Sequence, residues 1–574
     1  MSLFRYCFPA IALGSCIPLL AEAELAVTGV DRDIERNVRA FVSLAGENCE
    51  SEDWLVRRRF RTLESEARKA LEPFGFYDAV ITSDLTIDEP CWRATIAIEP
   101  GDPVLYRDVR LLLEGAAAED PAFEDLKEPR SLSPGAILKH ADYERLKRAM
   151  QVRAADRGYI DAHFVENSLD VWPEQHAADV SLHFDSGPRY RIGEIRVDQS
   201  FLEPAIVDGY LDLERGALFD SADLARAHRD LSDSAYFGDI EILADLDNAS
   251  NEEIPIQISL RPGTRIEYTV GIGASTDTGA RFRAGFRNNR LNTRGHRLIT
   301  DLGVSPVLQG LTAEYRIPLS DPRREWFSVT GALSNEETDT FDNDAQRLGL
   351  RWTKAMSDTW LRTLSLDASN ESFAVGQDID TTRFIVPGIS FDQKISDRDV
   401  FPAYGRRLGA ELRGTAEAIG STTSYLQTTV WSRWIRSFGN GNRILARLNA
   451  GATSSKDFTR LPPSVRFFAG GDQSVRGYDY NSLGPKDSDG NVIGGSNLLV
   501  ASLEYERHLR GNFFAAVFVD AGNAFDDTDF DPEVGAGFGL KWRSPLGPIR
   551  FYLGYPVTAD DQSIRFHLRL GADL

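Results

Sequence analysis

The stretch "RFFAGGDQSVRGYDYNSLGP", Arg466 to Pro485, decides the fold because it needs a structure that encloses it. Its glycine and aromatic residues show neither the alternation of a strand nor the spacing of a helix, and it is too apolar for a solvated loop. Within it, Arg476 lies in the tetrapeptide Val475-Arg476-Gly477-Tyr478. We expect the segment to fold back into the interior of a larger structure. Arg476 then needs carboxylate partners, since an unpaired buried charge is costly.

The sequence on both sides of this stretch, from Thr264 to the C-terminus, is typical of strands. Segments of about nine to twelve residues alternate in polarity between clusters of Gly, Asn, Asp and Pro, as in an outer-membrane barrel. Examples are "TRIEYTVGIG", "EWFSVTGAL", "RLGLRWTKA", "YLQTTVWSRWI", "NLLVASLEYE" and "SIRFHLRLGA". There are about sixteen, and an even number returns the chain to the side where it started. Residues 264–574 are therefore predicted to form an all-β transmembrane barrel of about 16 antiparallel strands.

The connections between these segments differ alternately in length. One set is short: "LSDPRRE", "SFGNGN", "LRGN" and "SPLGP". The other set is longer and acidic: "SNEETDTFDNDAQ", "NAFDDTDFDPEV" and "VTADDQ". Short periplasmic turns and longer extracellular loops are expected of such a barrel, whereas a water-soluble β-sandwich explains neither this asymmetry nor the number of strands. The acidic loops lack the spacing of an EF-hand, so we expect them to be solvated rather than to bind cations.

The N-terminus predicts export. In residues 1–23, Arg5 precedes an apolar run from Cys7 to Leu20, and Ala21-Glu22-Ala23 fits a signal-peptide cleavage site. Lipoprotein acylation at Cys16 is the alternative, although the apolar run continues past it. No later stretch approaches the ~20 apolar residues of a membrane helix. The net charge of −23 over 574 residues argues against a nucleic-acid partner.

Two cysteines, Cys49 and Cys91, remain after removal of the signal segment. In an oxidising compartment such a pair is more often a disulfide than a metal site, and neither a CxxC motif nor clustered histidines accompany it. We predict a disulfide. Closing a loop of about forty residues contributes ~4 kcal/mol in the chain-entropy model.

Three segments before the barrel share one plan, with a period of roughly eighty residues. Each has a short strand, two helical stretches, an aromatic-glycine corner and two strands that end at a glycine. The corners are Gly75-Phe76-Tyr77, Gly158-Tyr159-Ile160 and Tyr236-Phe237-Gly238, and the closing glycines are Gly101, Gly187 and Gly263. Residues 24–101, 102–188 and 189–263 are therefore predicted to be three small α+β modules, each with its helices packed on a three-stranded sheet.

The order of elements in these modules resembles the polypeptide-transport-associated (POTRA) domain. Three generic α+β modules without a binding role are the alternative. An exposed sheet edge can accept another strand, which is a common way to hold unfolded clients.

Three barrel segments carry a second resemblance. "VRGY" at 475–478, "VFVDAGNAF" at 517–525 and "GPIRFYLGYP" at 547–556 are together similar to the Omp85 superfamily of outer-membrane assembly and secretion proteins. In that superfamily POTRA domains precede a sixteen-stranded barrel. The resemblance covers essentially the whole chain after the signal segment.

Three POTRA-like units most resemble the outer-membrane subunit of the translocation and assembly module (TamA-like). The central assembly subunit typically has five units and two-partner secretion pores have two. The chain ends "GADL", whereas family members often end in an aromatic residue. The resemblance implies a bacterial outer-membrane location, periplasmic N-terminal domains, unfolded outer-membrane protein or autotransporter clients, and a TamB-like inner-membrane-anchored partner. A two-partner-type secretion pore with a dedicated substrate is the alternative function.

The same resemblance implies a lateral opening between the first and last barrel strands, near Thr264–Ala274 and Gln562–Ala572. We expect few hydrogen bonds there, which would let a client strand join the edge within the lipid. Paired positions were predicted within Tyr268–Ile272 and Phe566–Leu570. The glycines in these strands fit either this opening or ordinary barrel curvature; they are Gly271, Gly273 and Gly571.

Two carboxylates are predicted to hold Arg476. Glu504 lies in phase with Ser502 on the strand after the loop, and Asp520 lies on the next strand, beyond the turn "LRGN". Counting outward from that turn brings the two acids within one diagonal cross-strand spacing, ~7–8 Å. The matching arginine of the superfamily contacts acids at these two positions.

The sequence holds no G-x-S-x-G, H-E-x-x-H or P-loop motif, and its eight histidines are dispersed. We therefore expect neither an enzyme nor a bound metal or cofactor.

Overall fold

The computed structural model describes residues 23–88, 91–398, 400–439, 441–544, 547–559 and 563–570. The predicted signal segment, apart from Ala23, lies outside the described residues, as do Gln562, Gly571 and the chain end. The chain divides into two compact units, and the division runs through the third N-terminal module. Among the described residues, no helix is both long enough and apolar enough to cross a membrane.

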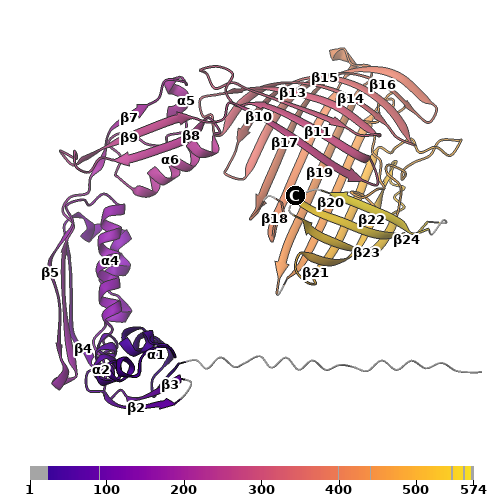
Figure 1. Cartoon of the computed structure of the whole chain (residues 1–574). Helices are drawn as coiled ribbons and strands as arrows, with labels where there is room; N and C mark the ends of the chain where they lie inside the picture. Colours follow the sequence, from indigo (N-terminus) through magenta and orange to yellow (C-terminus); the bar gives the residue numbers. More distant parts are fainter. Residues whose placement is uncertain are drawn as a thin grey trace, which may run out of the picture. The chain divides into compact units, whose positions relative to one another are not determined.

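The N-terminal region consists of three modules of the predicted β-α-α-β-β order (Figure 1). Each has its own three-stranded sheet, ordered β1-β3-β2, β4-β6-β5 and β7-β9-β8. The elements are β1 (Glu24–Thr28), α1 (Arg32–Phe41), α2 (Asp53–Leu71), β2 (Val80–Asp88) and β3 (Cys91–Glu99); β4 (Leu105–Glu114), α3 (Glu124–Lys127), α4 (His140–Asp156), β5 (His163–Trp172) and β6 (Ala177–Asp185); and β7 (Arg191–Asp198), α5 (Pro204–Asp208), α6 (Ser221–Asp233), β8 (Phe237–Ala244) and β9 (Glu253–Pro262).

Each module buries the faces that the sequence pattern predicts. In α2, Leu63, Ala67 and Leu71 are fully buried because they recur at helical spacing on one face. In the central strands, alternate residues enter the core while their neighbours face solvent, as the burial patterns of β6 and β9 show. One helical face on one sheet face gives each module its own small core.

The aromatic-glycine corners lie where one module joins the next part of the chain. The backbone amide of Val104 donates to the carbonyl oxygen of Gly75, and that of Tyr190 donates to that of Gly158. A Cβ at Gly158 would lie 2.8 Å from the Cβ of Phe219, so the second corner requires glycine for close packing as well as for its φ of +81°. At the third corner, the Tyr236 hydroxyl donates to the carbonyl oxygen of Gly295 in the barrel. The corner motif therefore serves as a repeated joint.

The C-terminal region is a closed barrel of strands β10 to β25 in sequence order, which confirms the predicted count of sixteen antiparallel strands. Its strands are β10 (Ile266–Ser275), β11 (Gly279–Asn288), β12 (Arg297–Val304), β13 (Leu308–Pro318), β14 (Glu325–Glu337), β15 (Phe341–Ala355), β16 (Trp360–Val375), β17 (Asp378–Ser396), β18 (Tyr404–Thr415), β19 (Tyr425–Phe438), β20 (Asn442–Ser455), β21 (Asn497–His508), β22 (Phe513–Phe525), β23 (Glu533–Ser544), β24 (Gly547–Pro556) and β25 (Arg565–Leu570).

The outer surface of the barrel is apolar. Side chains such as Leu333, Leu348, Val517 and Phe538 are more than half exposed, while their strand neighbours point inward. An outward apolar band around a polar interior is the arrangement required in a bilayer.

One predicted loop is wrong. "SNEETDTFDNDAQ" was assigned to a long acidic connection, but β14 runs to Glu337 and β15 begins at Phe341. Phe341, Asn343 and Ala345 are buried, while the acids between them point outward. The acidic residues therefore belong to the ends of two paired strands, and the inward faces of these strand ends are buried. The difference in length between the two sets of connections is smaller than predicted.

Candidate functional site

Residues 456–496 join β20 to β21, and we call this segment the lumenal loop. Its Val475 and Ala469 are fully buried and Arg476 is nearly so. Val475 and Ala469 belong to one apolar cluster with Val500 of β21. The loop therefore packs against the inner surface of the barrel wall, and its glycine and aromatic content suits that enclosed position.

Arg476 contacts both of its predicted partners. Its Nε and Nη2 donate to the two carboxylate oxygens of Asp520 at 2.7 and 2.9 Å, and Nη1 donates to Glu504 at 2.5 Å. The backbone amide of Arg476 also donates to Asp520, at 3.0 Å. The bidentate contact uses the planar fork of the guanidinium, which a lysine cannot reproduce.

Strand register explains why the two acids meet. Ser502 of β21 lies opposite Asp520 of β22, so Glu504 is one diagonal step from Asp520 on the same inward face. Leu503, which lies between Ser502 and Glu504, points outward and is more than half exposed. Because side chains alternate between the two faces of each strand, the buried carboxylates of Glu504 and Asp520 both point toward the lumenal loop.

Aromatic rings complete the enclosure of the guanidinium. Its central carbon lies 3.6 Å from the ring centroid of Phe518 and 4.6 Å from that of Tyr552. The Tyr552 hydroxyl donates to Glu504 at 2.7 Å. These rings exclude water from the ion pairs and add cation–π attraction.

Two glycines that the sequence analysis did not single out let the loop approach the wall. A Cβ on Gly535 of β23 would overlap the carbonyl oxygen of Arg476, and a Cβ on Gly554 of β24 would lie 2.8 Å from the amide nitrogen of Gly477. Gly477 itself has a φ of +103°. The signal that could have found them is glycine inside a strand, which often marks the close approach of another backbone.

The other motif residue, Tyr478, ties the loop to the far end of β23. Its hydroxyl donates to Glu533 at 2.7 Å and lies 2.9 Å from the Thr558 hydroxyl. The loop is therefore held at Arg476 and Tyr478 to β21, β22 and β23 and to the connection that follows β24.

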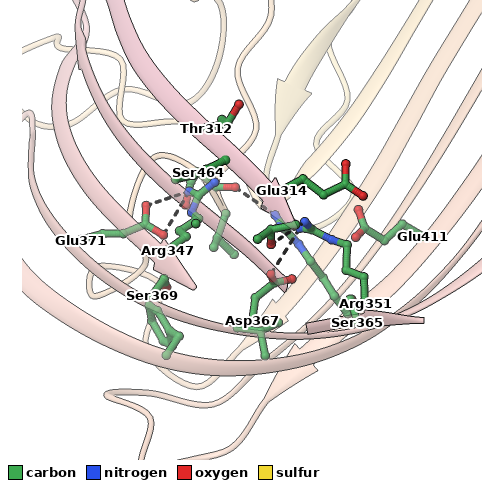
Figure 2. A pocket seen from close by; sticks show the side chains of 18 of the residues that line it. Thr312, Glu314, Arg347, Arg351, Ser365, Asp367, Ser369, Glu371, Glu411 and Ser464 are labelled. Atoms are coloured by element: carbon green, nitrogen blue, oxygen red, sulfur yellow. Dashed lines mark hydrogen bonds and ion pairs between the residues drawn. The ribbon is translucent and has the colours of Figure 1, made fainter. Parts of the chain in front are cut away.

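A second polar site lines another part of the lumen. A cavity of about 400 Å³ contains Arg347 and Arg351, which Figure 2 shows directed at Glu371 and Asp367. Arg347 donates to both oxygens of Glu371 at 3.1 Å, and Arg351 donates to Asp367 at 3.3 Å. Each of these arginines therefore has its own carboxylate.

The barrel closes where β10 meets β25, and we call this junction the seam. Among the described residues, Ser275 and Arg569 form its registered pair, and the Thr276 amide donates to the Leu568 carbonyl at 3.2 Å. The side chains of Tyr268, Val270 and Ile272 farther along β10 are 75%, 74% and 81% exposed. Most of β10 therefore has no described neighbour on its seam side.

This register corrects the predicted positions of the seam. Tyr268–Ile272 and Phe566–Leu570 were expected to face each other. In an antiparallel pair fixed at Ser275–Arg569, however, Phe566 falls beyond the end of β10 and Tyr268 falls beyond the described end of β25. Among the described residues, the two strands therefore meet at the C-terminal end of β10.

The predicted cysteine pair lies far from these sites. Cys49 precedes α2, Cys91 begins β3, and a disulfide joins them. It links the helical side of the first module to its sheet.

In the second module, Asp120 accepts hydrogen bonds from Arg157 at 2.8 Å and from the Tyr159 hydroxyl at 2.9 Å. Burial raises the pKa of Asp120, but these bonds and one from the Ala122 amide hold that pKa below its usual value. The ionised carboxylate therefore stabilises the second corner.

Comparison with known proteins matches both halves of the chain. A model described as "Omp85 superfamily domain" matches residues 263–573, and one described as "POTRA domain TamA domain 1" matches residues 24–100. The chain is 21% identical over 443 residues to the "Outer membrane protein assembly factor BamA" of Nitratidesulfovibrio vulgaris, covering 73% of this chain and 55% of that protein. The protein of the same name from Neisseria meningitidis is 22% identical over 568 residues, covering 87% of this chain and 70% of that protein.

The crystal structure of BamA from Haemophilus ducreyi lacking POTRA domains 1-3 superimposes with a TM-score of 0.69 at 16% identity. The match covers 82% of this chain and 99% of that one. This likeness shows the shared fold. The chain spans about half the length of the first of the two curated relatives.

Proposed function

Because the chain belongs to the Omp85 superfamily, we propose that it inserts other outer-membrane proteins, autotransporters included, into the membrane that holds its own barrel. The barrel lies in the bacterial outer membrane and the N-terminal domains lie in the periplasm. The proposed clients are unfolded outer-membrane proteins delivered on the periplasmic side.

The single observation that carries this proposal is the seam. β16 and β17 pair from Trp360 to Val375, whereas the described pairing of β10 with β25 is confined to Ser275 and Arg569. When β10 parts from β25, its edge in lipid offers a template on which a client strand can pair. The barrel wall thereby provides the lateral route.

The modules supply a second place where client strands can pair. Each sheet leaves its outer strands, such as β2 and β5, with one free edge among the described strands. The match of the first module to a TamA POTRA model supports a TamA-like subunit with a TamB-like partner anchored in the inner membrane. The modules would then receive clients or this partner by strand addition.

Cross-linking tests the lateral route. Cysteines at Ser275 and Arg569 should form a disulfide across the seam and stop client insertion into proteoliposomes, with activity restored by reduction. The matched control places cysteines at Leu364 and Ile389, which are opposite each other on β16 and β17. That tether should leave insertion unchanged. Normal insertion by the oxidised seam variant would refute the lateral route.

Affinity capture of the full chain from native membranes tests the partner. Recovery of a long inner-membrane-anchored protein is expected of a TamA-like subunit. Recovery of one dedicated secreted protein instead would favour a two-partner-type secretion pore.

A further inference from the structure

The outer face of β13 to β17 carries a pocket of about 640 Å³, which we call the outward pocket. These strands follow one another around the barrel wall (Figure 1). Strand pairing sets Ala313, Gly331 and Leu348, three residues of its lining, in one row on the same face. Leu348 is more than half exposed, whereas its chain neighbour Arg347 reaches into the lumen to Glu371. The outward pocket therefore opens on the surface that contacts lipid.

Small residues make the outward pocket deep, and larger apolar residues border it. Among the described residues, no atom lies within 4 Å of a Cβ built on Gly331. Ala313 and Ala368, in the same row, add one methyl group each. Leu333 and Leu348 stand beside them. The volume lies within the usual range of ligand pockets, ~300–1,000 Å³, and the lining suits an acyl chain.

A row of polar side chains borders the apolar part of the outward pocket. Gln346 of β15 lies opposite Asn370 of β16, which lies opposite Arg383 of β17, and all three line the pocket. The Arg383 Nε donates to Oδ1 of Asn370 at 3.3 Å. The backbone of Arg383 is fixed by Thr422, whose hydroxyl accepts from the Arg383 amide and whose amide donates to the Arg383 carbonyl, both at 2.8 Å. The guanidinium is therefore anchored beside the apolar groove.

This polar row lies where the outer surface changes from apolar to polar. The N-terminal domains are periplasmic and successive strands alternate in direction, so β17 begins on the extracellular side. In the next outward row toward that side, Asp344, Ser372 and Thr381 are paired with one another in turn. The row of Leu348 lies on the periplasmic side of Arg383. Arg383 is therefore at the level of the lipid headgroups.

The charge of Arg383 is not balanced within the protein. In the described part of the chain its guanidinium makes no ion pair, and its one side-chain hydrogen bond is the contact with Asn370. Asp380, the nearest acid along β17, is paired with Arg460 at 3.2 Å. A basic side chain at the headgroup level attracts anionic lipids.

We propose that the outward pocket binds one membrane lipid with an anionic phosphate headgroup. An acyl chain fills the groove over Gly331 and Ala313, and the phosphate accepts hydrogen bonds from the planar fork of Arg383. The side-chain amides of Asn370 and Gln346 supply further N–H donors. The pocket involves neither β10 nor β25, so this role is independent of the lateral route and of the clients.

Native mass spectrometry tests the headgroup. The full chain in detergent micelles is given equal amounts of phosphatidylglycerol and phosphatidylcholine, and the retained lipid is identified. We expect one phosphatidylglycerol per chain in preference to phosphatidylcholine, with retention weakened about tenfold by Arg383→Gln through loss of charge-assisted hydrogen bonds. The matched control is Arg436→Gln, which removes an outward arginine that lies over Tyr404 and should retain lipid like the wild type. No preference in the wild type, or equal loss in both variants, would overturn the proposal.

Filling the groove tests the acyl chain. Gly331→Leu has room for its side chain on the outer face, so it should unfold at the wild-type temperature in lipid-free micelles and lose the retained phosphatidylglycerol. Ala313→Leu fills the same groove from the neighbouring strand and provides the test if Gly331→Leu does not fold. A folded variant of either kind that retains lipid like the wild type would contradict the proposal.

Competition with inorganic phosphate separates a lipid from a free anion. At constant ionic strength, inorganic phosphate should leave the retained phosphatidylglycerol in place, because it has no chain to fill the groove. Displacement of the lipid from the wild type by inorganic phosphate would assign the site to a free anion and overturn the proposal.

Discussion

The wall formed by β20 to β24 and the seam between β10 and β25 differ in how they are held. Along the wall, each strand pairs with the next through at least ten residue pairs, and the lumenal loop adds the buried contacts of Arg476. At the seam, the described pairing is confined to one end of β10. The described part of the barrel is therefore held more extensively along this wall than at the seam.

The difference shows where stability and opening reside. Through Arg476 and Tyr478 the loop fastens β21, β22 and β23 from within. The Gly477 amide also donates to His567 of β25 at 2.9 Å, so the loop reaches the last strand as well. The proposed lateral route then requires that the junction of β10 with β25 opens. The account predicts large effects for changes at the wall and small ones for changes at the seam strand.

The largest effect is expected for Arg476. Arg476→Ala leaves Glu504 and Asp520 buried without their cation and should lower the free energy of unfolding by about 3–5 kcal/mol, with Arg476→Lys recovering only part of it. Urea unfolding of the folded barrel in micelles measures the loss. The control is Arg460→Ala, which removes an exposed ion pair to Asp380 from the same loop and should cost about 0–1 kcal/mol. Equal losses in the two alanine variants would contradict a special role for Arg476.

A smaller effect is expected from a single methyl group at the wall. Gly535→Ala places a Cβ against the Arg476 carbonyl and should destabilise the barrel by about 1–3 kcal/mol through overpacking. Gly273→Ala on the seam strand is the matched control, because no atom of the described residues lies within 4 Å of a Cβ at that position. The same urea titration should show a change of less than about 0.5 kcal/mol for the control. Reversed magnitudes would mean that the seam strand is the more tightly packed.

The smallest effect is expected at Tyr552, whose ring covers the ion pairs of Arg476. Tyr552→Phe removes a hydrogen bond to Glu504 and should cost about 1.5 kcal/mol, because the acceptor is charged and buried. Tyr505→Phe, whose hydroxyl bonds to Asn442 at a more exposed site, should cost about 0.5 kcal/mol. Identical unfolding midpoints for the two variants would show that burial adds nothing to the Tyr552 bond.

The meeting of Arg476 with Glu504 and Asp520 could be predicted because a short turn, "LRGN", fixes the register of β21 with β22. No turn joins β10 to β25, so counting residues could not predict the register of Ser275 with Arg569. The need for glycine at Gly535 depends on a loop that is distant in sequence. The acidic residues around Phe341 were mistaken for a loop. Strand ends that project beyond the bilayer lose the apolar alternation by which strands are recognised in a sequence.

Hydrogen exchange of backbone amides tests the central claim most directly. In the full chain, folded in lipid nanodiscs, amides of β10 from Tyr268 to Gly273 that face β25 should exchange orders of magnitude faster than amides of β16 from Leu364 to Ala368, because the latter are paired on both sides. Equally slow exchange in both strands would show a continuously paired seam and contradict the account.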